Sequence, residues 1–154
     1  MFFLYISYLF RLISTANSYG NTALHEAAHS GNAPVVYLLL EREAQITENH
    51  RGSTPLHTFA YSTNPATHPP AVFEALIQGG CTVRDRDRHG NTPSLVAVSA
   101  GRDDLLRLCL KYGASLKVND DMGRDAHEIA RFYGQEKMLK VLDEVEEEAH
   151  SHHK

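Results

Sequence analysis

The sequence predicts an all-α repeat solenoid, because one short pattern returns along the chain at a nearly constant interval. Residues 20–32 read GNTALHEAAHSGN, and imperfect copies of this stretch follow three more times. The copies align on leading glycines that are 32, 38 and 33 residues apart, namely Gly20, Gly52, Gly90 and Gly123. Self-similarity at a period of about 33, built from one turn and two short helices, indicates units that stack on one another to bury a shared core.

Further regularities support this repeat. An Asn or Asp lies three residues before each leading glycine, at Asn17, Asn49, Asp87 and Asp120. In three copies a second glycine follows eleven residues after the first, at Gly31, Gly101 and Gly134. An apolar run comes next, for example Val35, Val36, Leu38 and Leu39 in the first copy. Each unit is therefore expected to hold a first helix, a turn at the second glycine and a second helix.

Residues 22–25 (TALH) and 54–57 (TPLH), followed by the pair Ala27 and Ala28 and by Ala60, resemble the Thr-Pro-Leu-His motif of ankyrin repeats. Thr can cap a helix with its hydroxyl, and Pro at the first helical position loses an amide hydrogen that has no partner there. The third and fourth copies depart from the motif. The resemblance implies helix-turn-helix units joined by β-hairpin or turn loops, over residues 17–149, with units that start near residues 17, 49, 87 and 120.

The resemblance also implies a role for two histidines. His25 and His57 occupy the same place in their repeats and are expected to lie between stacked repeats, hydrogen-bonded to backbone or threonine hydroxyl groups.

Composition limits the possible functions. A chain of 154 residues with 42% hydrophobic residues suits one domain with a continuous core. A net charge of -4 and a pI near 6.2 argue against a protein that wraps nucleic acid. Cys81 and Cys109 fall at positions for small or apolar side chains, so we expect buried, reduced thiols in the cytoplasm or nucleus.

Residues 1–16 form a separate apolar segment, whose first 13 residues read MFFLYISYLFRLI. The run is shorter than the roughly 20 apolar residues that span a membrane. It is compatible with the second helix of a degenerate leading repeat that covers the first full repeat. A secretory signal cut after Ser14, Thr15 and Ala16 is an alternative, although no Lys or Arg precedes the apolar run. A wrongly assigned start of the chain is the remaining alternative.

The first repeat contains the sequence HEAAH, from His25 to His29, which has the form of a zinc-protease motif. Two imidazoles four residues apart share a helix face, and Glu26 would activate a water molecule. The helix ends soon after His29, however, and Asn32 and Val35 stand where a metzincin has Gly and His. A zinc hydrolase is therefore kept as a remote alternative, and no enzyme activity, metal or cofactor is expected.

Two loops stand out in the middle of the chain. The second repeat carries the extra residues in 61–70 (YSTNPATHPP), which predict a proline-stiffened surface loop on the edge opposite the turn tips. Residues 83–89 (VRDRDRH) alternate in charge and are either a solvated hairpin or a tip whose arginines meet acidic groups of a partner. Residues 150–154 are expected to be a flexible tail with histidines.

Binding to another protein is the expected function, since the architecture offers an extended concave surface. By their place in the repeat, the contact residues are expected beside the turn glycines, in the charged tip and after the paired alanines. They are Ser18, Tyr19, Asn21, His29, Ser30, His50, Arg51, Ser53, Tyr61, Arg86, Arg88, His89, Asn91, Ser99, Asp121, Met122, Arg124, Phe132 and Tyr133. A monomer is expected, with no nucleic-acid or membrane partner. A membrane-associated or secreted module remains the alternative if the N-terminal segment is an anchor or a signal.

Overall fold

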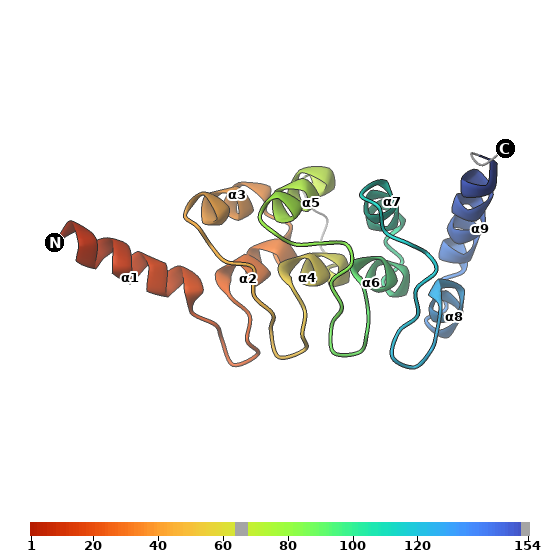
Figure 1. The fold of residues 1–154 in the computed structure, drawn as a ribbon, viewed down its shortest axis with the longest axis horizontal. Helices are drawn as coiled ribbons and strands as arrows, with labels where there is room; N and C mark the ends of the chain where they lie inside the picture. Colours follow the sequence, from red (N-terminus) through yellow and green to blue (C-terminus); the bar gives the residue numbers. More distant parts are fainter. Residues whose placement is uncertain (64–67, 152–154) are drawn as a thin grey trace.

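The computed structural model describes residues 1–63 and 68–151, and in these residues it contains nine helices (Figure 1). The helices are α1 (Phe2–Ser14), α2 (Ala23–Ser30), α3 (Ala33–Glu41), α4 (Pro55–Tyr61), α5 (Pro69–Gln78), α6 (Pro93–Ser99), α7 (Asp103–Lys111), α8 (Ala126–Phe132) and α9 (Glu136–Ser151). No strand occurs in the described ranges, so the loops between repeats are turns and not paired β-hairpins.

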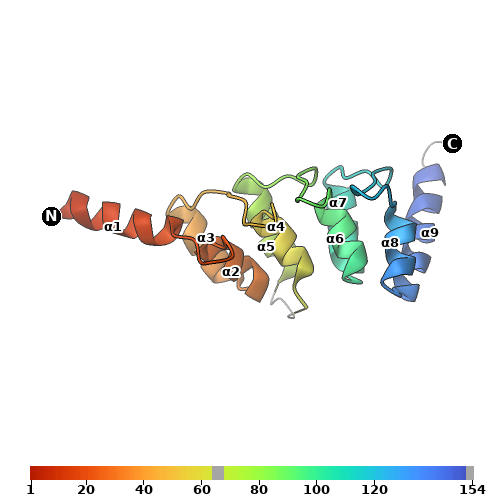
Figure 2. The same cartoon turned by 90° about the horizontal axis from the view of Figure 1, so that it is seen from below.

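The helices form two rows. In the first row α2 packs on α4, α4 on α6, and α6 on α8. In the second row α3 packs on α5 and α5 on α7, while α9 packs on α8. The loop tips extend beyond the first row, on the side away from the second row (Figures 1 and 2). The fold is thus the all-α repeat solenoid that the sequence predicted.

Capping explains where the first helices begin. In α2 the Thr22 side chain accepts from the backbone of His25, while the His25 ring accepts from the backbone N–H of Thr22. Thr54 and His57 form the same reciprocal cap on α4, and Asp125 and Glu128 do so on α8. Each cap satisfies amide groups that the first turn of a helix leaves without intrahelical partners.

The two histidines of the motif also join neighbouring repeats. The Nδ1 atom of His25 accepts from the Thr22 amide at 3.1 Å, so its Nε2–H donates to the carbonyl oxygen of Ser53 in the next repeat at 2.9 Å. His57 makes the equivalent bond to the carbonyl oxygen of Asn91 at 2.9 Å. Both rings are almost fully buried, as the family resemblance implied.

The core runs without interruption through the stack. Small residues of the first row are buried, which allows close helix packing, and they include Ala28, Ala60, Ala97 and Ala130. Larger buried side chains fill the space between the rows, among them Leu24, Phe59, Phe73, Leu76, Leu106, Ile129 and Leu142. The two cysteines are buried and free, and burial raises the pKa of Cys81 to about 11 and that of Cys109 to about 12. Both thiols are therefore protonated at neutral pH.

The N-terminal segment forms a helix at one end of the array, and most of its apolar surface is exposed. Helix α1 extends away from the array (Figure 1), and it buries none of its residues. Phe2, Phe3 and Leu4 are each more than 70% exposed. Its C-terminal half approaches the stack, where Leu9 and Ile13 are half-buried. Ile6, Leu9, Phe10 and Ile13 line a pocket of about 270 Å³ together with Glu41, Arg42 and Glu43.

The structure differs from two further expectations, one on the proline-rich loop and one on the C-terminal tail. Pro69 and Pro70 lie in the first turn of α5 and not in the loop before it, because proline fits the start of a helix. Residues 64–67, which carry the rest of that loop prediction, are outside the described residues. At the C-terminus, α9 continues to Ser151, so His150 is helical. Residues 152–154 of the expected tail also lie outside the described ranges.

Candidate functional site

Each loop tip is closed by the Asn or Asp that precedes its glycine. In the first tip, Asn17 Oδ1 accepts the backbone N–H of Tyr19 at 2.9 Å and that of Asn21 at 3.0 Å. The other three tips repeat this pair of bonds through Asn49, Asp87 and Asp120. The leading glycine of each tip has a φ between +71° and +80°, which glycine adopts without steric cost. The four tips therefore have one common, well-determined backbone shape.

Backbone hydrogen bonds tie each tip to the next one. The first residue of a tip donates its amide to the carbonyl of the second residue of the preceding tip. These bonds join His50 to Tyr19 at 3.0 Å, Arg88 to Arg51 at 2.9 Å, and Asp121 to His89 at 2.9 Å. The side chains on neighbouring tips are thus held on a continuous backbone support, which limits the entropy that they lose on binding a partner.

The leading glycines also leave room for side chains of the next tip. A Cβ atom on Gly20 would lie 2.8 Å from Cδ2 of His50, and one on Gly52 would lie 3.0 Å from Cγ of Arg88. A Cβ atom on Gly90 would collide with the carboxylate of Asp121. His50, Arg88 and Asp121 therefore occupy the space above the preceding glycine, so the glycines position these three side chains.

A groove of about 440 Å³ lies between the first two tips and the helices α2 and α4. Its lining residues are Tyr19, Asn21, His29, Asn49, His50, Arg51, Ser53, Thr58 and Tyr61. The Oγ atom of Ser53 is buried and has no hydrogen-bond partner among the described residues. Tyr19, His50 and Arg51 come from the tips, whereas His29, Thr58 and Tyr61 come from the two helices.

The expected contact residues differ in exposure. Fourteen are exposed, namely Ser18, Tyr19, His29, Ser30, His50, Arg51, Tyr61, Arg86, Arg88, His89, Asp121, Met122, Phe132 and Tyr133. Asn21, Asn91, Ser99 and Arg124 are half-buried. Ser53 is 1% exposed, which corrects its place in the predicted set. Its carbonyl oxygen accepts the hydrogen bond from His25 of the preceding repeat.

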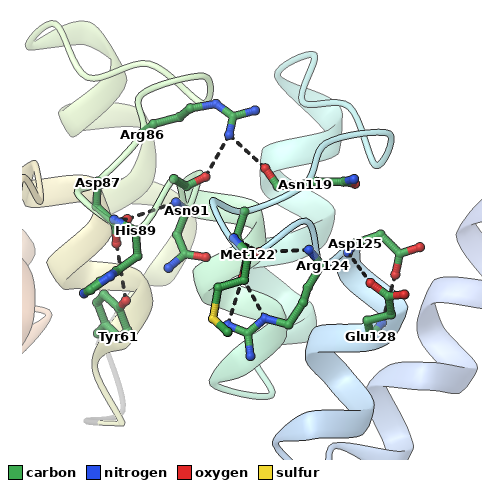
Figure 3. A network of polar contacts seen from close by, with 12 residues as sticks. Tyr61, Arg86, Asp87, His89, Asn91, Asn119, Met122, Arg124, Asp125 and Glu128 are labelled. Atoms are coloured by element: carbon green, nitrogen blue, oxygen red, sulfur yellow. Dashed lines mark hydrogen bonds and ion pairs between the residues drawn. The ribbon is translucent and has the colours of Figure 1, made fainter.

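Two of the predicted arginines are held by the protein itself (Figure 3). The Nη1 atom of Arg86 donates to the carbonyl oxygens of Gly90 at 3.0 Å and Asn119 at 2.8 Å, so this side chain joins the third and fourth loops. Arg124 forms an ion pair with Asp120 at 2.8 Å and lies 4.9 Å from the centre of the Phe132 ring. Both guanidinium groups thus have structural partners that the sequence pattern does not show.

The ionisation of two groups follows from these contacts. Burial opposes the charged form of Asp120, but hydrogen bonds from the Arg124 amide and side chain, together with its positive charge, lower the pKa of this carboxyl. Tyr61 donates to Asp87 Oδ2 at 3.5 Å. Burial of its hydroxyl and the negative charge of Asp87 raise the pKa of Tyr61 to about 12, so the phenol is neutral at physiological pH.

Comparison with known proteins identifies this architecture. A family model for ankyrin repeats, in three copies, matches residues 5–67. The E3 ubiquitin-protein ligase KEG of Arabidopsis thaliana is 34% identical over 115 residues, which are 73% of this chain and 7% of that protein. The chain is an ankyrin-repeat protein.

Other relatives carry similar ankyrin segments. A transient receptor potential cation channel subfamily A member 1 homolog of Caenorhabditis elegans is 28% identical over 132 residues, covering 84% of this chain and 10% of the channel. Human neurogenic locus notch homolog protein 1 is 30% identical over 109 residues, covering 70% of this chain and 4% of that protein. The ankyrin chain thus spans between 4% and 10% of the length of these relatives.

The HEAAH sequence serves the ankyrin fold. Both ring nitrogens of His25 are engaged by Thr22 and Ser53, so neither has a lone pair free for a metal ion. Burial lowers the pKa of His25, which keeps the ring neutral in this hydrogen-bonded position. In residues 1–63 and 68–151 there is no group of three or more His, Cys, Asp or Glu side chains placed to hold a metal ion.

No helix in the described part of the chain has the length and apolar character that crossing a bilayer requires.

Sequence reasoning missed several residues of this surface and its support. Asn49 and Thr58 line the groove but were not among the expected contacts. Arg102 Nη1 donates to the Ser62 carbonyl at 2.7 Å, and Gln135 Nε2 donates to the Ser99 carbonyl at 3.0 Å. Arg102 and Gln135 each follow the second glycine of their repeat, and this shared position is the signal that would have found them.

Proposed function

We propose that this ankyrin array binds another protein through its loop tips and the exposed face of its first helices, without catalysing a reaction. Ankyrin repeats are in general protein-interaction modules. The observation that carries the proposal is the chain of backbone hydrogen bonds between successive tips, which presents exposed side chains on a preformed support. Pre-organisation of this kind lowers the entropic cost of association.

The residue types on this surface support the same proposal. Tyr19, Arg51 and Tyr133 are exposed and have no part in the buried core. Tyrosine and arginine are enriched among the residues that dominate protein interfaces. We therefore place the main binding energy on the tips and on the adjoining helix ends, including Tyr61 of α4 and Phe132 of α8.

We also propose a cellular compartment, an oligomeric state and a partner class for this module. Two buried, free cysteines suit a reducing compartment, so we place the module in the cytoplasm or nucleus. We further propose that it acts as a monomer and takes neither nucleic acid nor membrane as its partner.

The test is a quadruple change of Tyr19, Arg51, His89 and Tyr133 to Ala in the full chain. All four side chains are exposed, so each change should shift the free energy of unfolding by less than ~0.5 kcal/mol. Partner capture from source cells should fall sharply, since a few aromatic and arginine anchors carry most of an interface's energy. Quantitative mass spectrometry of the captured proteins provides the measurement.

A matched control has the same composition away from the tips. Tyr5, Tyr8, Arg42 and His150 are also exposed and lie on α1, at the end of α3 and on α9. Their combined change to Ala should leave capture at the wild-type level. If the control loses the partners and the tip variant keeps them, the binding surface is not the one proposed.

A further inference from the structure

We infer that the two middle tips, residues 50–51 and 88–89, bind an acidic segment of the partner protein. This inference rests on the proposed function and names the chemistry of the partner. The two neighbouring tips carry two arginines and two histidines, namely His50, Arg51, Arg88 and His89, in a chain whose net charge is -4 with histidine counted as neutral. The outer tips differ, because the first carries Ser18 and Tyr19 and the last carries Asp121 and Met122.

The guanidinium groups of the middle tips have no hydrogen-bond or ion-pair partner within residues 1–63 and 68–151. Among the described residues, nothing hydrogen-bonds or ion-pairs with the side chains of Arg51 and Arg88. By contrast, Arg86, Arg102 and Arg124 are all bonded to carbonyl or carboxylate oxygens. The positive charge of Arg51 and Arg88 is therefore available to a ligand, and Arg is suited to bind a carboxylate through two parallel hydrogen bonds.

The fold holds these two arginines next to each other. The backbone N–H of Arg88 donates to the carbonyl oxygen of Arg51 at 2.9 Å. The absence of a side chain on Gly52 lets the Arg88 chain pass over it, since a Cβ atom there would lie 3.0 Å from Arg88 Cγ. The two acidic groups of the third loop are occupied, because Asp87 accepts two amides and the Tyr61 hydroxyl, and Asp85 binds Thr82.

The groove between the first two tips and helices α2 and α4 can hold the residues of the acidic segment that flank its carboxylates. The rings of Tyr19 and Tyr61 line this groove. An extended chain that places a carboxylate on Arg51 can therefore lay neighbouring atoms against two aromatic rings. The acidic residues of α9, including Asp143, Glu144, Glu146, Glu147 and Glu148, are exposed and would repel a long polyanion. A short acidic protein segment fits this charge distribution better than a nucleic acid.

The probes are three fluorescein-labelled peptides of 12 residues with the same Gly/Ser flanks. Their centres are Asp-Glu-Asp-Glu, Asn-Gln-Asn-Gln and Lys-Arg-Lys-Arg, and binding to the full chain is followed by fluorescence anisotropy at low and moderate salt. The acidic peptide should bind at least about tenfold more tightly than the neutral one. Added salt should lower the affinity of the acidic peptide. No binding of the acidic peptide at about 1 mM protein, or equal binding of the acidic and neutral peptides, would overturn the inference.

Variants of the full chain locate the site. The R51Q/R88Q variant should bind the acidic peptide with an affinity that is lower by about tenfold or more. The control R42Q/K111Q removes the same two charges from the ends of α3 and α7 and should weaken it less than about twofold. Equal losses in the two variants would assign the effect to overall charge. The R51E/R88E variant should bind the basic peptide more tightly than the acidic one. Its thermal unfolding midpoint verifies that it remains folded.

The two proposals fail in different ways. If the quadruple tip variant loses its cellular partners while the acidic peptide does not bind, the binding surface stands and the acidic chemistry is overturned. If the acidic peptide binds the middle tips while that variant keeps its partners, the proposed function is overturned and the tips hold a separate anion site.

Discussion

The imidazole of His25 is neutral inside the fold, because burial lowers its pKa. Its neighbours contribute in the opposite direction, through the hydrogen bond to Ser53 and the charge of Glu26. The ring spans two repeats, so its removal leaves the Thr22 amide and the Ser53 carbonyl without their partners. A single side chain thus links the capping of α2 to the packing of α2 on α4.

We expect His25→Ala to lower the free energy of unfolding by about 1–3 kcal/mol, as is typical for a buried hydrogen-bonded group whose partners are left unsatisfied. His29→Ala, four residues further along α2, is the control. His29 is exposed, so this change should cost less than ~0.5 kcal/mol. Urea unfolding followed by circular dichroism gives both values. Equal losses, or stability that depends on added zinc, would favour the metal site instead.

The free energy of unfolding should also depend on pH, because the imidazole of His25 has different pKa values in the folded and unfolded chain. The unfolded chain takes up a proton near the ordinary histidine pKa of about 6.5, whereas folded His25 has a lower pKa. Its contribution is therefore complete above about pH 6.5 and is lost as the pH falls toward the folded value. The wild-type protein should lose more stability between about pH 7.5 and 5.5 than His25→Ala does.

At the scale of elements, α1 is the exception in this fold. Its aromatic and aliphatic side chains are exposed, among them Phe2, Phe3, Tyr5, Ile6 and Phe10. The other helices each bury part of one face against a neighbour. Helix α1 therefore contributes exposed apolar surface and little packing.

Removal of residues 1–12 tests whether α1 contributes little packing. The deletion keeps Ile13, which packs against the core. Because α1 buries no residue, we expect the free energy of unfolding to change by less than about 1 kcal/mol. Binding of a hydrophobic dye such as ANS should fall markedly, since the deletion removes the exposed apolar side chains of α1. A loss of several kcal/mol would show that α1 caps the array in solution, as the sequence led us to expect.

The whole molecule depends on its last repeat, because repeats of this size bury a core only by covering one another. Helices α8 and α9 contribute the buried residues Ile129, Ala130, Met138 and Leu142. Gln135 also donates to the Ser99 carbonyl at the end of α6. Without this repeat, the faces of α6 and α7 that it covers would meet water.

Deletion of residues 123–154 should therefore leave an unfolded or aggregating chain, in contrast with the deletion of residues 1–12. Size-exclusion chromatography and thermal unfolding of the two truncated proteins, measured side by side, provide the comparison. A soluble monomer with an unchanged unfolding midpoint after the C-terminal deletion would contradict the capping role of the last repeat.

The sequence by itself determined the repeat architecture, because the signals that encode it act over a few residues. Thr22 and Thr54 begin helices, and the leading glycines take positive φ. Asn17 and its counterparts close the tips through amides two and four residues away. Such short-range signals recur with the period, so the fold and the location of the exposed tips could be predicted from the pattern.

Only the tertiary structure decided which of the predicted contact residues are available to a partner. Arg86 donates to the carbonyl oxygen of Asn119, which lies 33 positions further along the chain. Ser53 is buried at the junction where its carbonyl oxygen accepts from His25, 28 positions earlier. The exposure of α1 likewise depends on where the helix projects and not on its composition. These outcomes depend on which surfaces meet after the repeats stack, and a repeating local pattern does not contain that information.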